Sequence, residues 1–456
     1  MKHFTRRQWG IFSACFIAYS AAYISRVNLS PALPRIADEL SLSGAQTGLL
    51  VAVFAVTYAV GQIVNGLVSD RFNARYYILT GLLCSAAVNL LFSQAASYPA
   101  LLLLWLANGL FQSMLWTPVV RIIAARFEGE SRDGAAFGIS LTLIFGHLAA
   151  WGLSGWMISL YTWRFAFILS SVITAAFAAV SFMLMGGDIP AMRNARRAIK
   201  PGHAVAPAAP AAPAAPAAQV ATSAPAARIT IADLILKTGL IFTLACCVFS
   251  GYIRDGVMTW APMMLLDIHG FNIGTTTLIL LIIPSVNLIG ILLGRKVYES
   301  LGKDAYKTVA AMMGASAAGA LLLMLFGGIH PVVCALLLGT CSAIMNGLNP
   351  VLVTVIPVQF SGTGRVAAVA GILDAAIYLG SALAGALSGM LIDISGWALV
   401  SATWAISGVL GVAAQMVSAK GSREGANKGN KSNKSDTGNK GNKSDTGKKS
   451  DTEQIK

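Results

Sequence analysis

Charged residues are scarce in this chain of 456 residues. Asp, Glu, Lys and Arg make up 11% of it, whereas a soluble domain carries about 25%. The apolar share is 56% and the mean hydropathy is +0.68. So little charge cannot cover the surface of a water-soluble fold. This excludes an ordinary soluble enzyme, a disordered protein and a secreted disulfide scaffold, and it predicts a membrane protein whose partner is the lipid bilayer.

Motifs that carry catalytic chemistry are also missing. The six cysteines all fall inside apolar runs without the spacing of metal ligands, so we interpret them as buried thiols. The sequence contains no glycine-rich phosphate loop, metal-ligand cluster or nucleophile triad. We therefore expect no enzymatic activity, no cofactor and no metal.

The net charge of +14 comes almost entirely from hydrophilic segments that flank apolar runs. These segments are residues 1–7, 187–228 and 419–456. Such a distribution is typical of membrane topology and not of a nucleic-acid-binding surface. We therefore exclude nucleic acid as a partner.

Apolar runs long enough to cross about 30 Å of hydrocarbon occur twelve times. We predict spans at 9–31, 46–69, 76–94, 100–124, 135–159, 163–186, 230–265, 272–298, 306–327, 331–358, 365–392 and 397–418. The predicted fold class is therefore an all-α membrane protein with twelve transmembrane helices.

Low-complexity segments divide these spans into domains. An Ala/Pro-rich linker at 187–229 separates an N-terminal six-helix half, 1–186, from a C-terminal one, 230–418. The tail 419–456 repeats Lys-Ser-Asp-Thr and is predicted to be disordered. The basic segments predict a multi-pass protein of the cell (inner) membrane with both termini and the linker in the cytoplasm.

The loop after the second span carries Gly66-Leu-Val-Ser-Asp70-Arg71-Phe-Asn-Ala-Arg75. This resembles the signature of the major facilitator superfamily, whose fold has two pseudo-symmetric six-helix halves. The glycine permits close helix approach, and the charged residues form a gate at the helix ends. Arg121 is expected to make a further gate contact.

Other motifs resemble the organophosphate:phosphate antiporters of that superfamily. They include Tyr23-Ile-Ser-Arg26-Val-Asn28, Gln112-Ser-Met-Leu-Trp116 and Tyr252-Ile-Arg254-Asp255. The resemblance implies that Arg26 and Arg254 form an anion-binding pair. Where this family usually has a lysine in the second span, this chain has Gln62.

The residues themselves also single out the two arginines. A guanidinium inside an apolar span costs several kcal/mol, so it is a candidate functional group. Arg26 and Arg254 both stand late in the first helix of their half, and a forked guanidinium matches phosphate or carboxylate oxygens. The alternative is that each reaches the membrane interface or pairs with an acid, as Arg254 could with Asp255.

Further polar and aromatic residues inside the spans are candidates. Asp374, Asp255 and His147 are coupling candidates; Asp374 could instead balance an arginine or make a structural hydrogen bond, and His147 could bond a backbone carbonyl. Gln62 could bind a substrate hydroxyl or tie two helices together. Aromatic residues that could line a cavity, or simply pack, are Tyr23, Tyr58, Tyr252, Trp116, Trp260 and Tyr378.

These features predict a monomeric secondary transporter that moves a small organic anion by alternating access. The leading hypothesis is exchange of a sugar phosphate or related organophosphate for phosphate. The alternatives are a proton-coupled symporter of a carboxylate or sugar acid, and a membrane sensor of the same fold that does not transport.

Overall fold

The computed structural model describes most of both predicted halves. The described residues are 4–69, 72–128, 131, 134–135, 138–139, 141–185, 239–270, 273–360 and 366–440. Every regular element within them is a helix. The predicted linker 187–229, the motif residues Asp70 and Arg71, and the end of the tail lie outside them.

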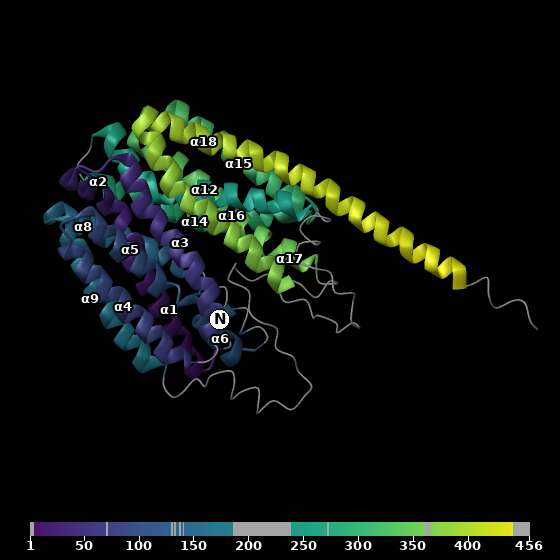
Figure 1. Ribbon diagram of the computed structural model, residues 1–456, viewed down its shortest axis with the longest axis horizontal. Helices are drawn as coiled ribbons and strands as arrows, with labels where there is room; N and C mark the ends of the chain where they lie inside the picture. The colour runs from purple at the N-terminus through teal and green to yellow at the C-terminus, as the bar shows by residue number, and fades with distance from the viewer. Residues whose placement is uncertain are drawn as a thin grey trace, which may run out of the picture.

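Two helical bundles lie side by side (Figure 1). The N-terminal half contains α1 (Arg6–Val27), α2 (Leu29–Leu40), α3 (Gly44–Val68), α4 (Ala74–Gln94), α5 (Tyr98–Gln112), α6 (Trp116–Arg126), α8 (Thr142–Leu160) and α9 (Trp163–Leu184). The C-terminal half contains α12 (Leu240–His269), α13 (Ile273–Leu280), α14 (Ile282–Ser300), α15 (Ala305–Phe326), α16 (Pro331–Pro350), the π-helix η2 (Val351–Val355), α17 (Ile356–Val358) and α18 (Val366–Lys440).

Eleven stretches of the described residues are long and apolar enough to cross a membrane. The last of them, Val369–Ala419, has 51 residues, and at about 1.5 Å per residue it is twice as long as one crossing needs. Gly396 divides it with φ 67° and ψ −159°, a conformation open to glycine, so that α18 turns back on itself there (Figure 1). The all-α fold with twelve crossings that the sequence predicts is confirmed.

The first crossing is broken between α1 and α2. Pro31 lacks the N–H that would bond to the carbonyl of Val27, and the helix is interrupted at Asn28. The Asn28 Nδ2 donates to Asn89 Oδ1 on α4 at 2.8 Å. This bond fixes the break close to Arg26, which lies in the last turn of α1.

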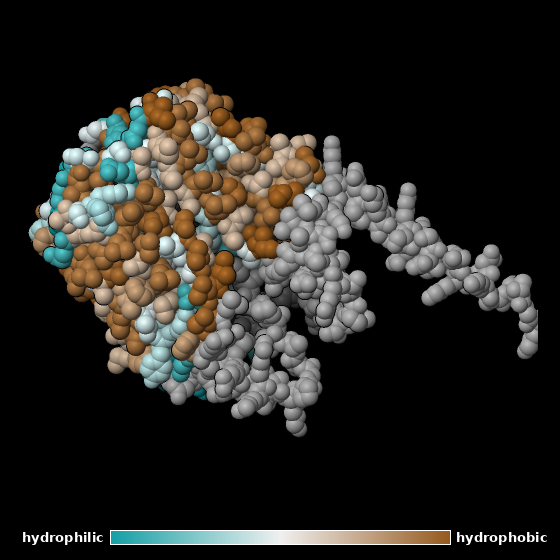
Figure 2. Space-filling view, in the orientation of Figure 1, coloured by the Kyte–Doolittle hydropathy of each residue, from teal (hydrophilic) through white to brown (hydrophobic). Residues whose placement is uncertain are grey.

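Large apolar side chains cover the outer surface. Ile63, Leu103 and Met183 are 63%, 67% and 76% exposed, and Figure 2 shows a mostly hydrophobic face with hydrophilic patches toward its edges. An apolar exterior of this extent is stable in lipid and not in water. The chain is a multi-pass integral membrane protein.

The end of α18 differs from the predicted disordered tail. The helix continues to Lys440 and projects beyond the bundle (Figure 1). Extending an existing helix adds one hydrogen bond per residue without a new nucleus, so α18 can run on through a polar sequence. The structure gives a helix up to Lys440, and the disorder of the tail stays a prediction.

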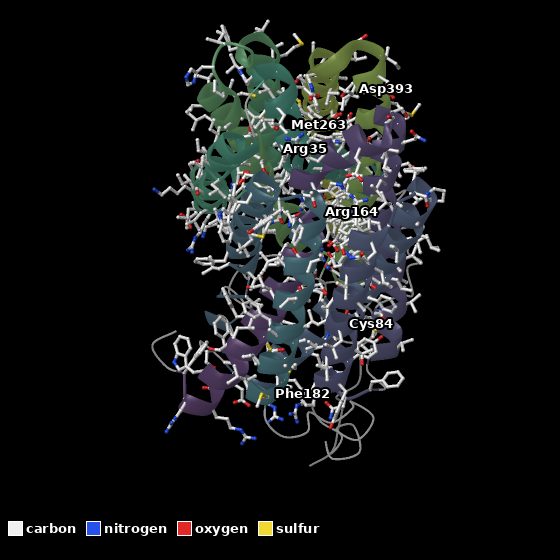
Figure 3. The ribbon with its side chains drawn as sticks, turned by 90° about the vertical axis from the view of Figure 1, so that its left-hand side faces the viewer. Arg35, Cys84, Arg164, Phe182, Met263 and Asp393 are labelled. Atoms are coloured by element: carbon white, nitrogen blue, oxygen red, sulfur yellow. The ribbon has the colours of Figure 1, made fainter. Side chains whose placement is uncertain are left out.

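The two halves meet closely at one end of the molecule. Gly44 and Gly48 of α3 pack on the backbone of Gly385 and Gly389 of α18. The carboxylate of Asp393 accepts hydrogen bonds from the N–H groups of Gly44 and Ala45, at 2.7 and 2.9 Å. Figure 3 faces this end, which we call the closed end, and shows Asp393 above Arg35 and Met263.

Two further pairs of helices join the halves. Ser30 of α2 donates to the carbonyl of Thr259 on α12 at 2.6 Å, and Gly155 of α8 faces Thr277 of α13. At the other end of the molecule, α6 and α17 diverge (Figure 1). We call this second end, which carries the N-terminus, the N-terminal end.

Candidate functional site

A cavity of about 300 Å³ lies between the two halves. Six predicted site residues of the N-terminal half line this cavity: Tyr23, Arg26, Tyr58, Gln62, Trp116 and His147. Those from the C-terminal half are Arg254, Asp255, Asp374 and Tyr378. The structure thus brings most of the candidate residues into one place.

Arg26 enters the cavity from the end of α1. Its Nε donates to Gln112 Oε1 at 3.1 Å, and no carboxylate of the described residues pairs with it. Three aromatic rings surround the guanidinium, with centroids 5.3, 5.4 and 4.4 Å from Cζ for Tyr23, Phe54 and Tyr58. Ring faces stabilise a cation without neutralising it, so the terminal nitrogens can still bind an anion.

A polar network behind Arg26 positions Gln112. The Gln112 amide donates to Ser25 Oγ and Ser85 Oγ, both at 3.1 Å. Asn89 and Asn108 both donate to the Ser25 carbonyl. All of these side chains are buried, and their mutual hydrogen bonds offset the free-energy cost of burying polar groups in an apolar bundle.

The sequence analysis did not assign Gln112 or its supports a role in the site. A usable signal was present, because Ser85 and Asn89, and likewise Asn108 and Gln112, stand four residues apart within apolar runs. At that spacing two polar side chains share one helix face.

Arg254 is at the matching position of the second half but has different partners. Its Nε and Nη2 donate to the two carboxylate oxygens of Asp255, at 2.8 and 3.0 Å, and its Nη1 contacts Asn349 Oδ1 at 3.5 Å. Ser381 also donates to Asp255. The pairing of Arg254 with its neighbouring acid, which the sequence left open, is the arrangement in this structure.

Two tyrosines connect the halves across the cavity, and Gln62 bonds to one of them. Gln62 Nε2 donates to the hydroxyl of Tyr58 at 2.7 Å, one turn earlier in α3, so it orients Tyr58 and forms no bond to another helix within the described residues. The ring of Tyr58 lies 5.3 Å from that of Tyr378 on α18. These rings are a contact between the halves beside Arg26, whose Cζ lies 4.4 Å from the Tyr58 ring centroid.

Asp374 and His147 differ in whether their side chains have a hydrogen-bonding partner. Asp374 lines the cavity from α18, and its carboxylate forms no hydrogen bond or ion pair with the described residues. His147 Nδ1 lies 2.7 Å from the carbonyl of Leu143, the backbone bond that the sequence offered as an alternative to ligand binding. Asp374 is therefore the unpaired acid of the cavity.

Two predicted site residues lie outside the cavity. Tyr252 bonds Thr403 Oγ1 at 2.8 Å, and Trp260 Nε1 donates to the carbonyl of Ala384 at 2.9 Å. Successive helix residues are rotated by about 100°, so Tyr252 lies about 160° and Trp260 about 120° away from Arg254 around α12. Neither side chain lines the cavity, because these faces of α12 pack on α18, the packing role that the sequence left open.

The residues of the loop motif are only partly described. Arg121 of α6 donates to the carbonyls of Ser69 and Phe72, at 2.7 and 3.0 Å, and so holds the loop after α3. Arg75 donates to the Phe182 carbonyl at 2.9 Å, with its guanidinium over the ring of Phe182. Gly66 lies within α3, whereas Asp70 and Arg71 lie outside the described residues.

Two helical halves around a central cavity, together with the loop motif, define a class of membrane proteins. Residues 15–373 match the family model of the Major Facilitator Superfamily, and the chain belongs to this family. A bacterial homologue of the human lysosomal transporter Spinster has the same fold, with a TM-score of 0.68 and 16% identity over 92% of this chain and 98% of that one.

Sequence comparison with curated proteins finds relatives that are more specific than the family and the fold. The glycerol-3-phosphate transporter of Bacillus subtilis (strain 168) is 26% identical over 59% of this chain, and the match spans 60% of that protein's length. The membrane sensor protein UhpC of Escherichia coli (strain K12) is 34% identical over 27% of this chain and 28% of its own length. These matches are to transport and sensor proteins and agree with the expectation that the chain is not an enzyme.

Proposed function

We propose that this protein transports a small organic anion across the membrane by alternating access, with Arg26 as the group that binds the acid. The observation that carries this proposal is a guanidinium in a cavity between two halves, without a carboxylate partner among the described residues. One chain supplies residues on both sides of the cavity, which supports a monomer as the working unit.

We propose organophosphates as the substrate class, with phosphate as the exchanged ion. The similarity to a glycerol-3-phosphate transporter supports this choice. We propose that the N-terminal end lies in the cytoplasm, which the basic segments near both termini and in the linker support. In this orientation the closed end faces outward, and the cavity is open to the cell interior.

The test is counterflow in proteoliposomes that are loaded with a phosphorylated metabolite or with phosphate. Arg26→Ala should abolish exchange and leave membrane insertion intact. Arg26→Lys should also fail, because an ammonium cannot replace the forked donors of a guanidinium. The matched control is Arg295→Ala, which removes an arginine that is 81% exposed and pairs with Glu299 away from the cavity. Exchange by Arg26→Ala at the wild-type rate would contradict the proposal.

A membrane sensor is the second candidate, because UhpC is among the relatives. Exchange without a proton gradient supports antiport, and uptake that requires a pH gradient supports the symport of a carboxylate or sugar acid. Tight binding without flux supports the sensor. The same preparation of vesicles distinguishes the three.

A further inference from the structure

The charges that line the cavity cancel. Besides His147, the acidic and basic side chains of the described residues that line it are Arg26, Arg254, Asp255 and Asp374. Two are cations and two are anions, however they pair. A phosphate monoester is mostly a dianion at pH 7.5, so it would bring two negative charges that these four side chains do not balance.

One charge of each sign is left without a partner. Arg254 and Asp255 form a bidentate pair, at 2.8 and 3.0 Å. Arg254 attracts Asp374 and Asp255 repels it, so the effects of the pair on that carboxylate oppose each other. Within the described residues, Asp374 has no hydrogen bond or ion pair, and the Nη atoms of Arg26 have none either. An unpaired carboxylate inside a membrane span is costly, so we expect a ligand to supply its partner.

The two unpaired charges come from opposite halves and are linked by two tyrosine rings. The Tyr58 ring centroid lies 4.4 Å from Arg26 Cζ and 5.3 Å from the centroid of Tyr378. Tyr378 follows Asp374 by four residues on α18, so the two share one helix face. The face of a tyrosine ring attracts an ammonium group. A cation that reaches Asp374 therefore meets an aromatic ring one turn further along the helix.

We propose that the organophosphate is zwitterionic: a phosphate monoester of a small amino alcohol, of which phosphoethanolamine is the simplest example. Its phosphate binds Arg26, and its ammonium group binds Asp374 beside the ring of Tyr378. The inference rests on the organophosphate transport proposed above and names the class of organophosphate.

An ammonium group suits Asp374 better than a hydroxyl group does. A hydroxyl donates a hydrogen bond but leaves the negative charge in the cavity, where it repels the phosphate. An ammonium group supplies both the donor and the opposite charge. Neutral amides of the wall, such as those of Gln62 and Asn349, can donate or accept, and they do not alter this balance of charge.

The test compares two phosphate monoesters of equal length that end in an ammonium or a methyl group. Purified full-length protein in phosphatidylglycerol nanodiscs, whose lipid carries no ammonium group, is titrated at pH 7.5 with phosphoethanolamine and with n-propyl phosphate. We expect phosphoethanolamine to bind at least about tenfold more tightly, because its ammonium group is a charged partner for Asp374. Asp374→Asn should lower the affinity for phosphoethanolamine about tenfold and raise that for propyl phosphate at least about threefold, because the carboxylate no longer attracts the one or repels the other.

Asp304→Asn is the matched control and should leave both affinities unchanged, since this aspartate caps α15 in the same half and does not line the cavity. A loss of affinity for both ligands in Asp374→Asn would give Asp374 a structural role and overturn the inference.

The wild type alone also decides the question. Equal affinities for phosphoethanolamine and propyl phosphate, which is the result if Asp374 carries a proton, would overturn the inference and leave the proposed function standing. Tighter binding of glycerol 3-phosphate than of phosphoethanolamine would do the same. Tighter binding of glycerophosphoethanolamine, the diester of a lipid headgroup, would overturn the assignment to a free monoester. Failure to bind or exchange any organophosphate or phosphate would instead contradict the proposed function.

Discussion

The contact of Asp393 with the first turn of α3 should control how firmly the closed end is shut. Ser43 Oγ already accepts from the N–H of Gln46, and Asp393 accepts from the N–H groups of the first two helical residues, Gly44 and Ala45. A carboxylate at a helix N-terminus also interacts favourably with the helix dipole. The bond joins the two halves, so it exists only while this end is closed.

The size of the effect follows from these two bonds. A hydrogen bond to a charged group contributes about 1.5–3 kcal/mol, and loss of a helix cap costs about 0.5–2 kcal/mol. Asp393 is exposed, so water replaces part of the interaction when the end opens. We therefore expect Asp393→Ala to favour opening by about 2 kcal/mol, a change of about 30-fold in the ratio of open to closed molecules.

Spin-label distances across the closed end measure this ratio. The labels are placed at Leu160 and Ile329, which are 57% and 71% exposed in different halves, in a Cys84→Ser background because the other five cysteines are buried. Asp393→Ala should add a population with a longer distance. Asp304→Ala, which removes a cap within one half, should not. A distance distribution that is unchanged in Asp393→Ala would refute the assigned role of this carboxylate.

Two further predictions concern selectivity and the tail. Gln62→Lys should place a second free cation beside Tyr58. At pH 7.5 it should raise the ratio of phosphate-monoester counterflow to counterflow of singly charged anions more than about tenfold, because one charge pair at 4 Å contributes about 4 kcal/mol at an effective dielectric of 20. An unchanged ratio would contradict this prediction. Deletion of residues 426–456, which lie beyond the last predicted span, should leave the initial rate of uptake nearly unchanged, and complete loss of flux from a normally inserted protein would contradict the prediction.

The crossings and the main site residues could be predicted from the sequence because membrane insertion depends on composition. Runs of about 20 apolar residues suffice to identify the helices, and an arginine inside such a run is conspicuous. The prediction that Arg26 faces a cavity needed no knowledge of its neighbours, since a buried guanidinium must find polar or aromatic surroundings.

The direction that each side chain faces could not be predicted in the same way. Lipid and the protein interior are both apolar, so a membrane helix lacks the polar outer face that marks orientation in a soluble protein. Tyr252 and Trp260 were for this reason assigned to the cavity although they pack between helices. The bidentate pairing of Arg254 with Asp255 is a choice of rotamers and was one of three possibilities in the sequence.

The glycine contacts at the closed end have an electrical consequence. Backbone lies directly on backbone where Gly44 and Gly48 meet Gly385 and Gly389, and a methyl group added to Gly385 would come within 2.8 Å of the Ala52 nitrogen. Backbone in direct contact leaves no room for water or ions between these two helices, so we expect much of the membrane voltage to drop at this end. A charge in the cavity then shares the potential of the N-terminal end. In the alternating access proposed above, closing the other side instead would move each unbalanced charge through the field, at about 2.3 kcal/mol per 100 mV.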